Sequence, residues 1–231
     1  MEFLSSPDFW IGLMKIIWIN IILSGDNAVV IALAARSLPP EQQRKAIMIG
    51  SGAAVVLRVV LTIVAAQLLA MPYLQIIGGV LLLWIGVQLL GEEEEEDDGE
   101  PKASNLMNAV RTILIADLVM SLDNVIGVAA AAKGDQLLLI IGLAISIPLV
   151  VFGSSMMIKM MERFPIIVVF GAGLIGWVGG ETIVSDVSLK EVLAANTWLH
   201  YAAAAVGAAL VVGVGKYLQN RHAATEPEAS A

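Results

Sequence analysis

Long apolar runs separated by short polar connections make up most of the chain. A helix that crosses the hydrocarbon core of a bilayer needs about 20 predominantly apolar residues. The pattern predicts an all-α membrane protein with seven transmembrane helices, at about residues 9–35, 45–69, 73–90, 106–132, 136–160, 165–183 and 198–218. We expect the polar segment 186–197 to lie at the membrane interface and the tail 220–231 to be disordered.

Two of these runs contain the same short polar interruption. Residues 24–27 read Ser-Gly-Asp-Asn, and residues 121–124 read Ser-Leu-Asp-Asn. A carboxylate at the centre of a bilayer costs about 3 kcal/mol or more, so its presence calls for a function or a partner. Asp and Asn also compete for nearby backbone groups, which disfavours a helix interior. We therefore expect the first and fourth helices to be broken at these positions, with backbone carbonyls lining a cavity.

The interruptions belong to an internal repeat. A shift of 97 positions aligns Asn20, Ser24, Asp26 and Asn27 with Asp117, Ser121, Asp123 and Asn124. A shift of 93 positions aligns Pro72, Gly78 and Trp84 with Pro165, Gly171 and Trp177. Three spans per copy reverse the direction of the chain, so the repeats at 1–91 and 105–184 should be inverted, as in many transporters. Residues 185–219 then hold the interfacial segment and the seventh helix.

The polar side chains in and around the interruptions predict an ion site. Carboxylate and amide oxygens are the ligands that hard divalent cations such as Mn²⁺, Mg²⁺ and Ca²⁺ prefer. The candidate metal ligands are Asp26, Asn27, Asp117, Asp123, Asn124 and Glu181, with Asn20, Ser24, Ser121 and Arg58 in support. The chain has no Cys, which excludes thiolate ligands and disulfides. We expect no permanently bound cofactor, only a transported dication.

Two of these residues have a second interpretation. Arg58 lies near the centre of an apolar run, where it is expected to form a buried pair with Asp26, Asp123 or Glu181. Alternatively, Arg58 competes with the metal for a carboxylate. Glu181 is a ligand or lies at the hydrated outer end of its helix. The sequence leaves both alternatives open.

Charge patterning indicates how the chain crosses the membrane. Eight of its 21 acidic residues lie between Glu92 and Glu100, in a loop at 92–104, so the helical part is close to neutral and no nucleic-acid partner is indicated. Basic residues concentrate on one side of the predicted bundle, at Arg36, Arg44, Lys45, Lys102, Arg111, Lys159, Arg163, Lys216 and Arg221. Since basic loops stay in the cytoplasm, we expect the acidic loop and the C-terminus there and the N-terminus outside.

The paired motifs resemble those of the TerC family of membrane proteins. That family has two Ser-x-Asp-Asn motifs, each with an acidic residue six positions before the Asp. Asp117 matches this upstream acid, whereas the first copy has Asn20 and so one carboxylate fewer. The resemblance covers all seven predicted spans and points to a short bacterial branch of metal transporters. It implies a location in the bacterial cytoplasmic (inner) membrane and a role in metal-ion homeostasis, chiefly manganese export.

Two other functions compete with divalent-metal transport. An amino-acid exporter of the lysine-exporter type would bind its substrate at the ends of broken helices rather than through carboxylates. A non-transporting membrane scaffold would recruit a partner through the acidic loop. No catalytic Ser/His or Cys/His set occurs in the predicted spans, so we do not expect an enzyme. The sequence does not identify the transported ion or its coupling ion. It also leaves open whether the protein forms a homo-oligomer.

The inverted topology can be tested with single cysteines, because the native chain has none. Cysteines introduced at positions 99 and 187 should react with an impermeant thiol reagent from opposite sides of the membrane, position 99 from the cytoplasm. Labelling of both positions from the same side would contradict the predicted topology.

Overall fold

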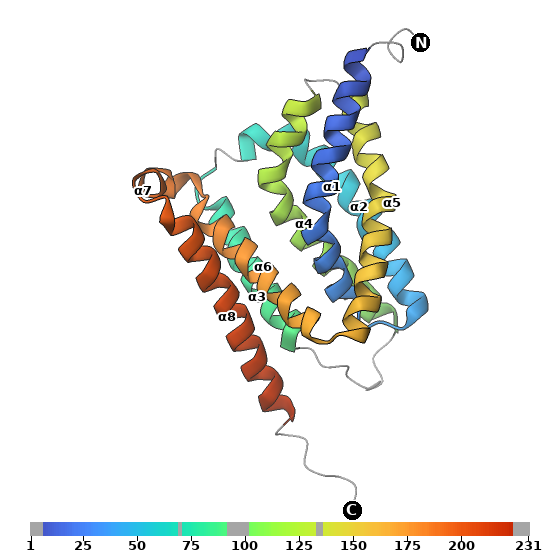
Figure 1. Cartoon of the computed structure of the whole chain (residues 1–231), viewed down its shortest axis with the longest axis vertical. Coiled ribbons are helices and arrows are strands. Elements are labelled where there is room, and N and C mark those ends of the chain that lie inside the picture. The colour runs from blue at the N-terminus through green and yellow to red at the C-terminus, as the bar shows by residue number, and fades with distance from the viewer. Residues whose placement is uncertain (1–6, 69–70, 92–101, 133–135, 224–231) are drawn as a thin grey trace, which may run out of the picture. The chain divides into compact units, whose positions relative to one another are not determined.

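The protein is α-helical throughout the residues that the computed structural model describes, which are 7–68, 71–91, 102–132 and 136–223. The elements in chain order are α1 (Pro7–Ala35), α2 (Pro40–Leu68), α3 (Leu74–Gly91), α4 (Lys102–Ala132), α5 (Gln136–Arg163), α6 (Ile166–Val184), η2 (Val187–Leu189), α7 (Lys190–Ala195) and α8 (Trp198–Ala223) (Figure 1). Each predicted span coincides with one long helix to within a few residues. The acidic run 92–98 and the tail 224–231 lie outside the described residues.

Six helices within the described ranges are long and apolar enough to cross a membrane. They are α2, α3, α4, α5, α6 and α8. Helix α1 is not among them, because its fully described apolar segment, Gly25–Ala35, is too short to cross a membrane. The all-α membrane fold is thus confirmed, whereas the seventh span and the inverted repeat stay predictions.

The expected breaks in the first and fourth helices are not present. Helix α1 runs without interruption through residues 24–27, and α4 does so through residues 121–124. The polar groups find partners within their own helices: Asn124 Nδ2 donates to the Met120 carbonyl at 2.9 Å, and the backbone N–H of Asn27 donates to Asp26 Oδ1 at 2.9 Å. An unwound turn would leave several backbone groups without partners in an apolar environment, which costs more than two weak helix formers do.

The helices group into two compact units that do not follow the boundaries of the repeat. Unit 1 comprises residues 1–71 and 106–159, and therefore contains α1, α2 and most of α4 and α5. Unit 2 comprises residues 72–105 and 160–231, and contains α3, α6, α7 and α8. Each unit thus takes helices from both predicted repeats.

Unit 2 is held together by close contacts between glycine-rich helix faces. A Cβ added at Gly79 of α3 would lie 2.5 Å from the Gly179 carbonyl oxygen of α6, and one added at Gly176 would lie 2.5 Å from the Gly207 carbonyl oxygen of α8. Larger side chains would push these backbones apart. Small residues at such positions allow helices to pack by van der Waals contact where lipid removes the hydrophobic driving force. Helices α3, α6 and α8 accordingly lie side by side (Figure 1).

The carboxylate of Asp186 caps α3 from a distant part of the sequence. Asp186 is fully buried, and its oxygens accept hydrogen bonds from the backbone N–H groups of Tyr73 at 3.0 Å and Gln75 at 3.1 Å. Its own turn adds the Ser188 N–H at 2.9 Å and the Ser188 hydroxyl at 2.6 Å. Tyr73 has a φ of 68°, which a residue with a Cβ rarely adopts. These bonds therefore satisfy the first N–H groups of α3 and fix the turn before it.

This cap should make the stability of unit 2 depend on pH. Burial alone raises the pKa of Asp186, but the hydrogen bonds from Ser188, Tyr73 and Ile76 outweigh it and lower the pKa from 3.8 to about 2. The folded pKa is below the unfolded value, so the stabilisation is complete above pH 3.8 and is lost as the pH falls toward 2. Asp186→Ala should cost about 1–2 kcal/mol at neutral pH, the usual cost of losing a helix cap. Thermal unfolding of the purified protein in detergent measures both effects.

Glu191→Ala is the matched control, because Glu191 is exposed in the adjacent α7. It should leave the melting temperature and its acid dependence unchanged. Equal melting temperatures for Asp186→Ala and Glu191→Ala would show that the cap does not stabilise unit 2.

Candidate functional site

An ion pair lies buried among the helices of unit 1. Arg58 of α2 and Asp117 of α4 form a salt bridge through Arg58 Nη2 and Asp117 Oδ1, with side chains only 5% and 6% exposed. Both helices are among those long and apolar enough to span a membrane. A single charge there would be costly, and the pair removes most of that cost. The predicted buried pairing of Arg58 is confirmed, but its partner is Asp117 rather than Asp26, Asp123 or Glu181.

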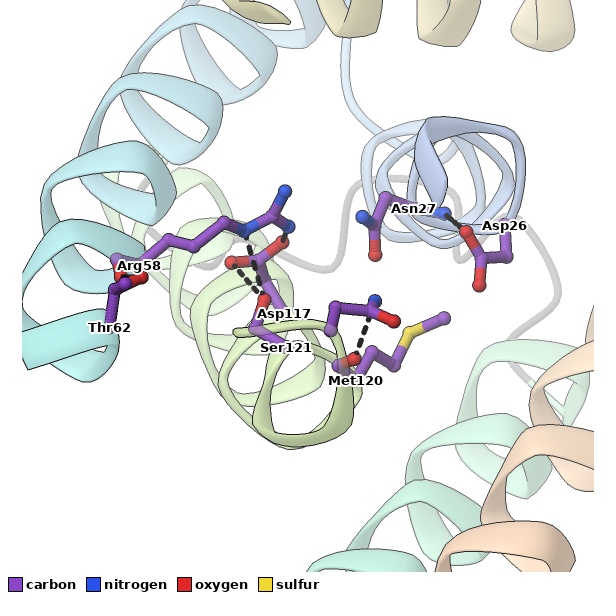
Figure 2. Close-up of polar contacts among 8 residues, drawn as sticks. Asp26, Asn27, Arg58, Thr62, Asp117, Met120 and Ser121 are labelled. Carbon is purple, nitrogen blue, oxygen red and sulfur yellow. Dashed lines mark hydrogen bonds and ion pairs between the residues drawn. The ribbon is translucent and has the colours of Figure 1, made fainter. Parts of the chain in front are cut away.

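Ser121 completes the network around the pair. Arg58 Nε donates to Ser121 Oγ at 3.1 Å, and Ser121 Oγ donates to Asp117 Oδ2 at 3.3 Å. Asp117 and Ser121 are four residues apart on α4, so they share a helix face, as their spacing predicts. On α2, the Thr62 hydroxyl donates to the Arg58 carbonyl at 2.7 Å. Both oxygens of Asp117 are therefore engaged, and Figure 2 shows the closed arrangement of the three side chains.

Helix α1 brings the first motif to the same region of unit 1. Asn27 is buried, with 3% of its surface exposed, and it lines a cavity together with Arg58 and Asp117. Asp26 is partly exposed and lies farther around α1, on the side away from the ion pair (Figure 2). The adjacent Asp and Asn thus point in different directions, as neighbouring residues on a helix do.

The cavity between these helices is small and has polar groups on several sides. Its volume is about 20 Å³, close to the space that one water molecule occupies. Four helices line it, through Asn27, Ile31, Ser51, Ala54, Val55, Arg58, Asp117, Ile147 and Val150. Ser51 is 3% exposed, and its Oγ has no hydrogen-bond partner among the described residues. A buried hydroxyl without a partner beside a carboxylate is available to an ion or a water.

Ser51 was missed by the sequence analysis. It lies seven residues before Arg58, two helical turns along the same face of α2. This spacing is a signal that could have found it, but a Ser within an apolar helix most often bonds to its own backbone.

The remaining predicted residues fall into three groups. Asn124 lies on α4 in unit 1, where its amide is bonded to the Met120 carbonyl. Glu181 belongs to unit 2, where its carboxylate lies 3.4 Å from His200 Nε2. The side chains of Asn20, Ser24 and Asp123 lie outside the part of the chain that the structure describes. Among described residues, no three His, Asp or Glu side chains come close enough together to hold a metal.

The helices and the buried charge network define a multi-pass integral membrane protein. A sequence model of the integral membrane protein TerC family matches residues 5–223, which is nearly the whole chain. The protein belongs to this family, as the paired motifs predict.

The relatives are bacterial membrane proteins. The membrane protein YjbE of Bacillus subtilis (strain 168) is 45% identical over 187 residues, which cover 81% of this chain and 85% of YjbE. YkoY of the same organism is 28% identical and covers 79% of this chain and 62% of its own length. YegH of Escherichia coli (strain K12) is 29% identical over 73% of this chain but only 36% of YegH. No solved structure matches the chain.

The coupling within the ion pair can be measured by a double-mutant cycle. Arg58→Leu and Asp117→Leu each leave a buried charge without its partner, and each should lower the free energy of unfolding by about 3–5 kcal/mol. The double variant should recover most of that loss, because two apolar side chains replace a neutral pair. Thermal unfolding in detergent gives the three differences.

Arg111→Leu is the control, since Arg111 is exposed on the same helix as Asp117. It should have little effect. A double variant whose loss equals the sum of the two single losses would mean that Arg58 and Asp117 do not stabilise each other.

Proposed function

We propose that this protein is a transporter of divalent metal cations that exports Mn²⁺ from the cytoplasm. The observation that carries the proposal is the buried Arg58–Asp117–Ser121 network in unit 1, beside a cavity lined by Asn27 and Ser51. Ionisable residues within membrane helices commonly mark the path of an ion. Membership of the TerC family and six described membrane-length helices support this assignment.

The donor set of the site suits a hard dication. The ligands we propose are oxygens from α1 and α4. Those of Asn27 and Asp117 lie at the cavity, and those of Asp26, Asp123 and Asn124, from the same two motifs, would bind the ion elsewhere on its path. Ser51 Oγ on α2 is a further oxygen at the cavity. Mn²⁺ and Mg²⁺ take such ligands at short distances, whereas soft cations prefer sulfur. Glu181, in unit 2, stays a further candidate ligand from the sequence, and its carboxylate would first have to leave His200.

The size of the cavity favours an ion over an amino acid. Pockets that bind small organic molecules measure about 300–1,000 Å³, whereas this one measures about 20 Å³. An amino-acid exporter of the lysine-exporter type would need a much larger site. A non-transporting scaffold would need neither the buried charges nor the cavity, and would depend on the acidic segment 92–98.

Neutralising the two motif aspartates should separate transport from folding. Asp26→Asn and Asp123→Asn keep the shape and one oxygen of each side chain but remove a charge that offsets the lost hydration of the ion. Each should reduce Mn²⁺ transport at least about tenfold, the effect of about 1.4 kcal/mol in the barrier. Membrane insertion should be unchanged, because an amide is less costly to bury than a carboxylate. Mn²⁺ uptake into inside-out vesicles, corrected for protein level, measures transport.

Asn27→Ala and Asn124→Ala are matched controls that remove a neutral ligand from the neighbouring position. They should reduce transport less than the aspartate variants do. Normal transport by both aspartate variants at normal abundance would refute the metal site. Absence of both variants from the membrane would instead indicate a structural role.

A further inference from the structure

We infer that the guanidinium of Arg58 is a tethered competitor of the transported cation. It occupies Asp117 when the cation is absent and must leave Asp117 when the cation binds. This inference rests on the proposed function and specifies how the site releases its ion. The structure provides two observations in its support: both oxygens of Asp117 are hydrogen-bonded, and the cavity beside Arg58 is also lined by the buried hydroxyl of Ser51.

The first observation is that both oxygens of Asp117 already accept a hydrogen bond. Oδ1 is bonded to Arg58 Nη2, and Oδ2 accepts from Ser121, which itself accepts from Arg58 Nε. A dication can use this carboxylate at full strength only if the guanidinium withdraws. The affinity of the site is therefore the difference between two interactions, the carboxylate with the dication and the carboxylate with Arg58.

The second observation is that a cavity with a hydrogen-bond acceptor lies beside Arg58. The cavity of about 20 Å³ adjoins its side chain, and Ser51 lines the same cavity two turns earlier on α2. A serine hydroxyl accepts hydrogen bonds, and Arg carries five donors in a planar fork. The Arg58 backbone stays in place because α2 is regular there and Thr62 bonds to the Arg58 carbonyl. Only the side chain needs to move.

The exchange solves an electrostatic problem of transport. When an ion leaves a buried carboxylate, the carboxylate is left charged and without a partner. This costs several kcal/mol and slows release of the ion. If Arg58 returns as the ion departs, Asp117 is paired in both states. Binding is then weak enough for the ion to leave, which fast transport requires.

The test is equilibrium binding of Mn²⁺ to the purified full-length protein, by calorimetry and by the Mn²⁺-dependent rise in melting temperature. Arg58→Gln removes the competitor and should tighten Mn²⁺ binding at least about tenfold, while transport in vesicles slows. Arg58→Lys keeps a charge but loses the planar guanidinium that also bonds Ser121. The Mn²⁺ affinity of this variant should therefore lie between those of the wild type and Arg58→Gln. The tightening should vanish in a variant that combines Arg58→Gln with Asp117→Asn.

The control is Arg111→Gln, which removes the same charge from an exposed position on α4 and should leave the affinity unchanged. Arg58→Gln is purified with Mn²⁺, because the dication should replace the missing partner of Asp117 and raise the melting temperature more than in the wild type. If Arg58→Gln does not fold even with Mn²⁺ present, the Mn²⁺ affinity of Arg58→Lys is the deciding measurement, since this variant keeps the charge that pairs with Asp117.

The outcomes separate this inference from the proposed function. Tighter binding that depends on Asp117 supports both. If the wild type binds Mn²⁺ and Arg58→Gln leaves the affinity unchanged or lowers it, Arg58 is not a competitor, although the metal site stands. If Arg58→Gln does not fold, an unchanged affinity in Arg58→Lys leads to the same conclusion. Absence of binding in the wild type and in the Arg58 variants, with Mn²⁺ or any other dication, overturns the metal site and the competitor with it.

Discussion

The salt bridge between Arg58 and Asp117 is the constraint on which the arrangement of unit 1 depends. Two charges in an apolar bundle are tolerated only when they meet and when their remaining donors and acceptors are bonded. Ser121 meets that condition by accepting from Arg58 and donating to Asp117. The network therefore fixes how α2 and α4 are rotated toward each other. Apolar contacts alone would not fix that rotation, because both helices carry apolar residues on all sides.

The need to hydrogen-bond every polar group in an apolar environment also explains why α1 and α4 are continuous. Each motif places an Asp and an Asn in an apolar environment. Among the described side chains, Asp26 accepts from the neighbouring Asn27 N–H, and Asn124 donates to the Met120 carbonyl one turn before it. Continuous helices leave no backbone carbonyls free for an ion. The ligands that we propose are therefore side chains on several helices, and Ser51 of α2, which the sequence analysis missed, lines the cavity of unit 1. The continuity of the helices also makes the site small, because regular helices lie close together.

The sequence predicted the helices well and their contacts poorly, for a physical reason. Helix positions follow from the length of each apolar run, which is a local property. The partner of Arg58 depends on helix rotation, and the three partners proposed from the sequence, Asp26, Asp123 and Glu181, did not include Asp117. The cap of Asp186 on α3 joins residues more than 100 positions apart, with no local pattern to reveal it. Grouping into units likewise depends on contacts such as those of Gly79 and Gly176, which reflect the fold of distant segments.

Charge balance connects the ion pair to the chemistry we propose. Asp26, Asp117 and Asp123 together carry three negative charges, and Arg58 supplies one positive charge. The proposed ligands and Arg58 therefore have a formal net charge of −2, which one dication neutralises. Arg58 stays within the site whether or not it contacts Asp117, so this balance holds before and after the exchange.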